Sequence, residues 1–118
     1  MTNVGLSIEF EDRQGIQVLH VSGPLDSMTH DQFKSQVDPL VSQPRVRIVL
    51  DCENLTYVNS RGLTLMAHYQ RLAAANLSFF AVAALNNRVS KAIELLGMDK
   101  VVKLYPTVAE ALQTAAAL

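Results

Sequence analysis

The residue of this chain best placed for regulatory chemistry is Ser60, a serine at the predicted start of a helix. The first backbone N–H groups of a helix have no intrahelical acceptor and lie at the positive end of its dipole. A phosphate on Ser60 would therefore be well accommodated by the domain itself. It would also add up to about two negative charges to a neutral surface, which would repel a partner that packs an apolar or acidic surface there.

The patterns that usually mark enzymes and metal sites are missing from the sequence. Ser60 lacks a Gly-x-Ser-x-Gly context and obvious His and Asp partners in a known order. The glycines are too scattered for a nucleotide-binding fingerprint, and the histidines lack the spacing of metal ligands. We therefore expect no enzymatic activity, no metal and no cofactor.

Composition favours one small globular domain over residues 1–118. The chain has 118 residues, of which 49% are hydrophobic and 18% charged, enough to bury one core. Ten basic against eleven acidic side chains offer no surplus of cations for nucleic acid. No secretory signal is visible and no apolar stretch reaches the roughly 20 residues of a membrane helix. We expect a cytoplasmic protein without membrane insertion that is monomeric alone.

Hydrophobic periodicity predicts an alternation of strands and helices. We expect strands over 4–10, 16–21, 45–52, 77–83 and 101–104, helices over 28–42 and 60–75, a short helix from Asn86 or Asn87 to Gly97, and a last helix after Thr107. This order predicts an α/β fold: a mixed, mostly parallel β-sheet with an N-terminal hairpin, packed against about four helices.

Local signals set the expected boundaries. Residues 11–15 read as the hairpin turn, 22–24 as the end of the second strand, and 53–59 as a loop. Asp26 and Thr29 are candidate N-caps of the first helix, with Gln32 completing a capping box, and Pro39 is expected to kink or shorten that helix. Function in such folds gathers in loops at the carboxyl ends of strands, here 23–31 and 53–63.

Buried faces can be assigned to the short helix and to the methionines. Val89, Ile93 and Leu96 are expected to face the core. Met28, Met66 and Met98 are predicted to fill gaps in the core, and Met98, after a helix end, is the one expected to be exposed for a partner.

Several segments together resemble the STAS family, specifically bacterial anti-sigma factor antagonists related to the sporulation regulator SpoIIAA. The matching segments are Val21-Ser22-Gly23-Pro24-Leu25-Asp26, an apolar strand with a Gly-x-Leu-Asp type of turn; Ile48-Val49-Leu50-Asp51, a central strand; Val58-Asn59-Ser60-Arg61-Gly62-Leu63, the serine signature; and the short helix that ends at Gly97-Met98. The resemblance covers nearly the whole chain, and the combination is more specific than any one segment.

The resemblance implies a STAS fold and a partner switch. In that family the unphosphorylated domain binds an anti-sigma factor that is also a serine kinase, phosphorylation of the signature serine breaks the complex, and a phosphatase restores it. Ser60 occupies that serine's position. The residues expected to bind the partner are Asp26, Thr29, Asn59, Ser60, Arg61, Gly62, Leu63 and Met98.

Two departures from the family pattern keep alternatives open. Asn59 stands where the family usually has an acid, which removes a charge beside Ser60, and Arg61, in place of a small residue, can pair with a phosphate. Asn59, Ser60 and Asp26 also suit simple N-caps, and Gly62 suits either close packing or the approach of a partner. The alternative functions are a non-phosphorylated STAS scaffold or transporter-associated regulatory subunit and, on fold analogy alone, a ligand sensor.

Overall fold

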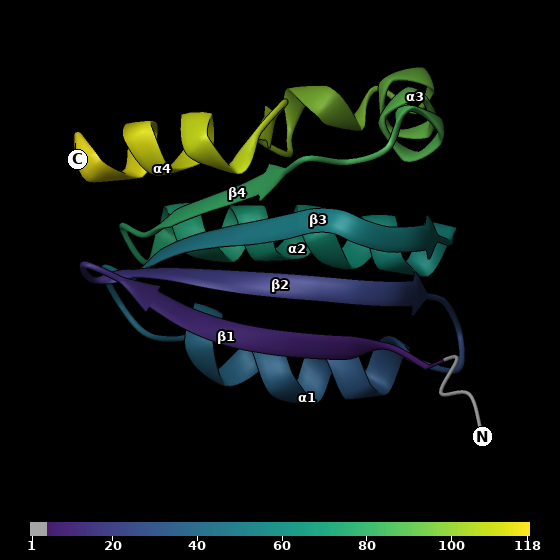
Figure 1. Ribbon diagram of the computed structural model, residues 1–118, viewed down its shortest axis with the longest axis horizontal. Coiled ribbons are helices and arrows are strands. Elements are labelled where there is room, and N and C mark those ends of the chain that lie inside the picture. Colours follow the sequence, from purple (N-terminus) through teal and green to yellow (C-terminus); the bar gives the residue numbers. More distant parts are fainter. Residues whose placement is uncertain (1–4) are drawn as a thin grey trace.

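A mixed sheet of five strands organises the part of the chain that the computed structural model describes, residues 5–118 (Figure 1). The strands are β1 (Ser7–Arg13), β2 (Ile16–Leu25), β3 (Arg47–Val58), β4 (Phe79–Ala83) and β5 (Leu104–Tyr105), and they lie in the sheet in chain order. The helices are α1 (His30–Val41), α2 (Ser60–Ala75), α3 (Asn87–Leu95) and α4 (Val108–Ala116), with the short 3₁₀ helix η1 (Met98–Lys100) after α3.

Strand pairing confirms the predicted fold class. β1 and β2 form an antiparallel hairpin, and each later pair of neighbouring strands is parallel. The hairpin turn is the two-residue segment Gln14-Gly15, whose φ angles of 54° and 86° fit the tight turns that match strand twist. The predicted turn over 11–15 was therefore too long, because residues 11–13 continue the ladder with β2.

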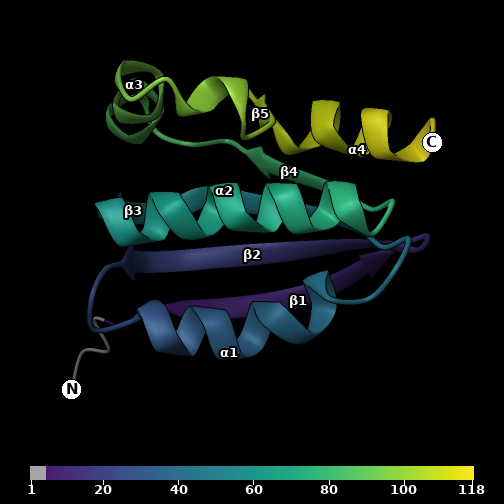
Figure 2. The same ribbon diagram turned by 180° about the vertical axis from the view of Figure 1, so that it is seen from behind.

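Helices cover both faces of the sheet, and alternate strand residues face each layer. α1 and α2 lie together on one face, as Figures 1 and 2 show from opposite sides, and pack on residues such as Phe80 and Val82. α4 packs on the other face through Ala111 and Ala115, opposite Phe79. Every β4 residue is buried, as expected for a strand covered on both faces. Of the helices in residues 5–118, none combines the length and apolar character needed to cross a membrane.

β2 and β3 are longer than the sequence predicts. The segment 22–24 does not end β2, which runs to Leu25 through two irregularities in its pairing with β3. Gly23 has φ +92°, and a Cβ there would lie 2.5 Å from the carbonyl oxygen of Gly5. Pro24 lies beyond the last pair of the β1 ladder, where its missing N–H costs no bond to that strand. Residues 53–58, predicted as a loop, continue β3 because β2 still pairs with them.

Smaller corrections concern helix ends and the last strand. Leu96, predicted to face the core, is 62% exposed, because α3 ends at Leu95 and Gly97 turns the chain with φ +71°. The last strand is Leu104–Tyr105 rather than 101–104, since η1 and a turn occupy the preceding residues. Pro39 lies inside α1, which ends two residues later. Val4 of the predicted first strand lies outside the described residues.

Candidate functional site

The parallel pairing of β2 and β3 brings the starts of α1 and α2 together. Leu25 pairs with Val58 at the carboxyl ends of the two strands, and the Leu25 carbonyl accepts a 3.0 Å hydrogen bond from the Asn59 N–H. Each helix then begins within a few residues of its strand end. As a result, Arg61 Nη2 of α2 lies 3.5 Å from His30 Nδ1 of α1, although the residues are 31 positions apart.

Asn59 and Ser60 have different roles at the start of α2. Asn59 is the N-cap: its backbone is extended and its Oδ1 accepts a 2.9 Å hydrogen bond from the Gly62 N–H. Ser60 is exposed, and its hydroxyl has no hydrogen-bond partner among residues 5–118. The cap needs only a side-chain oxygen, which Asn59 supplies as an acid would. The exposed Ser60 hydroxyl therefore takes no part in capping α2.

Asp26 and Thr29 close the turn between β2 and α1. Asp26 Oδ1 accepts hydrogen bonds from the N–H groups of Met28 (2.9 Å) and Thr29 (3.1 Å). Thr29 Oγ1 accepts from the Asp26 N–H and donates to the Pro24 carbonyl. The predicted capping box between Thr29 and Gln32 is wrong, because Thr29 Oγ1 bonds backward to this turn and Gln32 Nε2 donates to the Leu6 carbonyl.

Gly62 and Leu63 lie beneath the site rather than on its surface. Both are buried, and a Cβ on Gly62 would lie 2.8 Å from Val58 Cγ1 and 3.0 Å from Leu25 Cδ2. Leu63 packs against Val89 and joins α2 to α3. These two residues set how closely the start of α2 approaches the strand ends, and so fix the position of Ser60.

The exposed apolar side chains are not those that the sequence suggested. Met98 is only partly exposed and packs against the core, whereas Met28, predicted to fill a core gap, is 92% exposed in the turn before α1. Tyr57, half-exposed near the end of β3, was missed. Met28 stands between polar residues with no periodic apolar neighbours, and that signal could have identified it.

A groove with basic walls runs between α1 and α2, and Ser60 lies at one end of it. Its volume is about 450 Å³, and it is lined by His30, Lys34, Ser60, Arg61, Thr64, Leu65, His68 and Arg71. No acidic side chain is among these lining residues. Sequence reasoning singled out only Ser60 and Arg61, although the spacing of 61, 64, 68 and 71 places those residues on one helical stripe.

A second ionic cluster lies on the sheet face opposite α1 and α2. His20 Nε2 is 2.7 Å from Glu11 Oε1, and His20 Nδ1 is 2.7 Å from Asp51 Oδ2. These hydrogen bonds, the one to Glu11 first, raise the pKa of His20. Hydrogen bonds from Arg13 and then His20 lower the pKa of Glu11. The cluster thus ties together three neighbouring strands.

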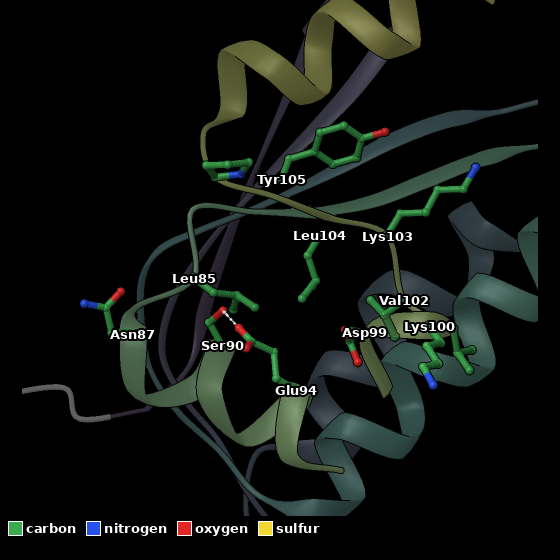
Figure 3. Close-up of a pocket in the computed structure, with 12 residues that line it drawn as sticks. Leu85, Asn87, Ser90, Glu94, Asp99, Lys100, Val102, Lys103, Leu104 and Tyr105 are labelled. Atoms are coloured by element: carbon green, nitrogen blue, oxygen red, sulfur yellow. Dashed lines mark hydrogen bonds between the residues drawn. The ribbon is translucent and has the colours of Figure 1, made fainter. Parts of the chain in front are cut away.

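A larger hollow, of about 650 Å³, lies between α3, η1 and β5 (Figure 3). Leu104 points into it, and Ser90 lies 3.5 Å from Glu94 on its α3 wall. Acidic Glu94 and Asp99 line it together with basic Lys100 and Lys103. Charges of both signs give this hollow no clear preference for an anion or a cation, and Ser60 and Asp26 do not line it.

The chain is similar in sequence to anti-sigma factor antagonists and similar in fold to solved structures. The chain is 28% identical over 110 residues to the anti-sigma F factor antagonist of Paenibacillus polymyxa, an alignment covering 92% of this chain and 94% of that protein. An anti-sigma factor antagonist from Mycobacterium paratuberculosis has a similar crystal structure, with a TM-score of 0.85 at 27% identity over 98% of this chain and 97% of that one.

Part of a much larger protein is similar in fold as well. The murine anion transporter Slc26a9 matches with a TM-score of 0.76 at 14% identity, over 92% of this chain but 19% of the transporter, a likeness that concerns the fold alone.

The model of the STAS domain matches residues 7–111 of this chain. With that match over most of its length, the chain belongs to the STAS domain family.

Proposed function

We propose that the protein is an anti-sigma factor antagonist of a cytoplasmic partner-switching pathway. In this role it binds an anti-sigma factor that is also a serine kinase, and reversible phosphorylation of Ser60 controls the complex. A cognate phosphatase restores the binding form. The antagonists among its relatives support the general role. The observation that carries the switch is the Ser60 hydroxyl at the first residue of α2, which is exposed and has no hydrogen-bond partner among residues 5–118.

The surroundings of Ser60 suit a surface that binds one partner and is turned off by charge. Exposed Met28 and half-exposed Tyr57 are apolar side chains at the same edge of the sheet, available for burial in a complex. A phosphate on Ser60 would lie at the N-terminus of α2, where the dipole favours it within the free protein. The same phosphate would have to be desolvated against the partner, so the complex would lose affinity.

In this proposal four of the expected partner-binding residues position the binding surface and do not contact the partner. Their polar groups or side chains already bond or pack within the chain: Asp26, Thr29, Gly62 and Leu63. Met98 contributes in the same way, by packing below α3. Asn59, Ser60 and Arg61 are the signature residues left to meet the partner. The protein acts as a monomer that binds other proteins, without catalysis and without nucleic acid.

The test compares Ser60→Ala and Ser60→Asp as bait proteins in extracts of the native cells, together with phosphopeptide mass spectrometry of the untagged protein. We expect Ser60 phosphate whose occupancy changes between growth and stress. Ser60→Ala should retain an ATP-binding kinase that Ser60→Asp loses at least about tenfold, as the added charge costs more than about 1.4 kcal/mol. Ser35→Asp, on an exposed face of α1, is the matched control and should retain the kinase.

Equal retention of the kinase by both Ser60 variants would contradict the switch. The alternative, a non-phosphorylated scaffold or transporter-associated subunit, predicts a different pair of results. Ser60 would remain unmodified in every condition, and a membrane transport protein would be retained by wild type, Ser60→Ala and Ser60→Asp alike.

A further inference from the structure

The groove between α1 and α2 has two facing rows of nitrogen-bearing side chains. Arg61, His68 and Arg71 lie along one stripe of α2, and His30 and Lys34 lie one turn apart on α1. Leu65, which is 6% exposed, gives the groove an apolar lining residue. Arg61 and Arg71 are ten positions apart, or about 15 Å along the helix, which matches about four to five residues of an extended peptide.

Two of the positive charges of this groove have no carboxylate partner among residues 5–118. Arg61 and Arg71 form no ion pair with any of residues 5–118. Lys34 is paired with Asp38, 2.7 Å away, and Asp31 lies near His30 with its side chain 96% exposed. Within the described part of the chain, the groove therefore holds two guanidinium groups without a carboxylate partner, on a protein whose formal net charge is −1.

We infer that this groove binds a carboxylate-rich segment of the partner, with Arg61 and Arg71 as its two charged anchors. Guanidinium groups bind carboxylates bidentately, and this geometry gives specificity as well as affinity. A segment is favoured over a single ion because the two arginines stand about 15 Å apart along α2. A nucleic acid is disfavoured because the chain has no surplus of Lys and Arg with which to follow a phosphate backbone beyond this short groove.

The position of Ser60 adds a mechanism of release, and this part rests on the proposed function. Ser60 lines the same groove as Arg61. A phosphate there competes with the acidic segment for Arg61 and repels its carboxylates. Phosphorylation then displaces the partner from within the groove, in addition to blocking the apolar surface around Met28 and Tyr57.

The test is a titration of the unphosphorylated ¹⁵N-labelled protein with an end-blocked pentaglutamate peptide, followed by amide chemical shifts. We expect shifts concentrated in 60–71 and 30–34, and none of comparable size with pentalysine. Affinity should fall several-fold between 50 and 300 mM salt, because exposed charges are screened. Arg61→Gln with Arg71→Gln should weaken binding roughly tenfold, as two exposed charge-assisted contacts are lost.

The matched control is Arg88→Gln with Lys91→Gln, which removes the same charge from exposed positions of α3. This variant should bind the peptide as wild type does. Shifts spread over the whole surface, or equal weakening by both double variants, would overturn the inference. So would an oligothymidylate of equal charge that shifts the groove amides as strongly as pentaglutamate does.

The experiments distinguish a failure of the inference about the groove from a failure of the proposed Ser60 switch. If pentaglutamate binds the groove but Ser60 is never phosphorylated in cells, the switch fails and the acidic-segment site stands. If Ser60→Asp releases the kinase while pentaglutamate leaves the groove amides unmoved, the switch stands and the groove inference fails. If both hold, Ser60→Asp should also weaken the binding of pentaglutamate several-fold.

Discussion

Two groups of ionisable side chains lie on opposite sides of this protein and are treated differently by the fold. On the sheet face opposite α1 and α2, His20 bonds to Glu11 and Asp51, and Arg13 lies 2.7 Å from Glu11. On the outer surface of α1 and α2, Arg61 and Arg71 have no carboxylate partner within residues 5–118. The first group joins neighbouring strands, whereas the second adds little to the fold and remains available to another molecule.

The difference teaches how to separate structural from functional charge in a small domain. Charges paired within a chain stabilise it modestly and are already satisfied. Unpaired charges on one surface do not lower solubility or stability while water hydrates them. They contribute most to binding free energy when a partner of opposite charge displaces that water. We expect substitutions in the two groups to affect stability and binding in opposite proportions.

The largest expected effect on stability comes from a substitution at Gly62, which is buried beneath the start of α2. A β-branched side chain in Gly62→Val would overlap Val58 and Leu25, whose atoms already lie 2.8 and 3.0 Å from the position of a first Cβ. We expect a loss of about 2 kcal/mol in the free energy of unfolding, measured by urea denaturation. Ala74→Val, on the exposed side of the same helix, is the control and should cost about 0.5 kcal/mol. Equal losses in the two variants would show that Gly62 has no packing role.

Removing His20 from its cluster with Glu11 and Asp51 should have the next largest effect on stability. His20→Gln removes charged hydrogen bonds to Glu11 and Asp51 from a side chain that is about one third exposed. We expect a loss of about 1 kcal/mol at pH 6, less than for a buried pair because solvent screens the site. Urea denaturation measures it, with His68→Gln on α2 as the control for the loss of an exposed imidazole. A His20→Gln variant as stable as wild type would place the cluster among ion pairs of no energetic value.

The pH dependence of the same cluster sharpens the comparison. The raised pKa of His20 means that its contribution to stability is complete below about pH 6.5 and is lost as the pH rises through the higher folded value. The lowered pKa of Glu11 means that its contribution is present above about pH 4.3 and is lost as the pH falls through the lower folded value. The free energy of unfolding of wild type should therefore exceed that of His20→Gln most clearly between these two pH values.

Urea denaturation of wild type and His20→Gln from pH 4 to 9, with NMR titration of the His20 ring, measures this dependence. The difference between the two proteins should shrink on the alkaline side in step with loss of the His20 proton. A difference that grows with pH would reverse the assigned sign and contradict the role of a protonated His20.

The smallest expected effect on stability belongs to the groove arginines. Arg61→Gln with Arg71→Gln should change the free energy of unfolding by no more than about 0.5 kcal/mol, because neither side chain forms an ion pair within residues 5–118. Thermal and urea denaturation beside wild type measure it. A loss as large as that of His20→Gln would show that these arginines support the fold, and the contrast between the two clusters would disappear.

Sequence alone was sufficient for the features that depend on neighbouring residues. The start of α2 at Ser60 was predicted and is confirmed. The start of the short helix at Asn86 or Asn87 and that of the last helix after Thr107 are confirmed too, with Asn86 and Thr107 as the N-caps. Helical periodicity, capping side chains and a left-handed glycine such as Gly97 are recorded within a few positions, so they can be read locally. The α/β class followed from the order of these elements.

Tertiary structure decided what depends on partners far along the chain. The lengths of β2 and β3 are set by their pairing, which holds the mostly polar segment 53–57 in a strand that local sequence assigns to a loop. Thr29 bonds back to Pro24 instead of capping α1, because the turn offers a carbonyl at 2.8 Å. The basic groove unites His30 and Lys34 with Arg61 and Arg71 because parallel strands start both helices at one edge of the sheet. No local pattern encodes that proximity, since it arises only when the strands between those residues pair.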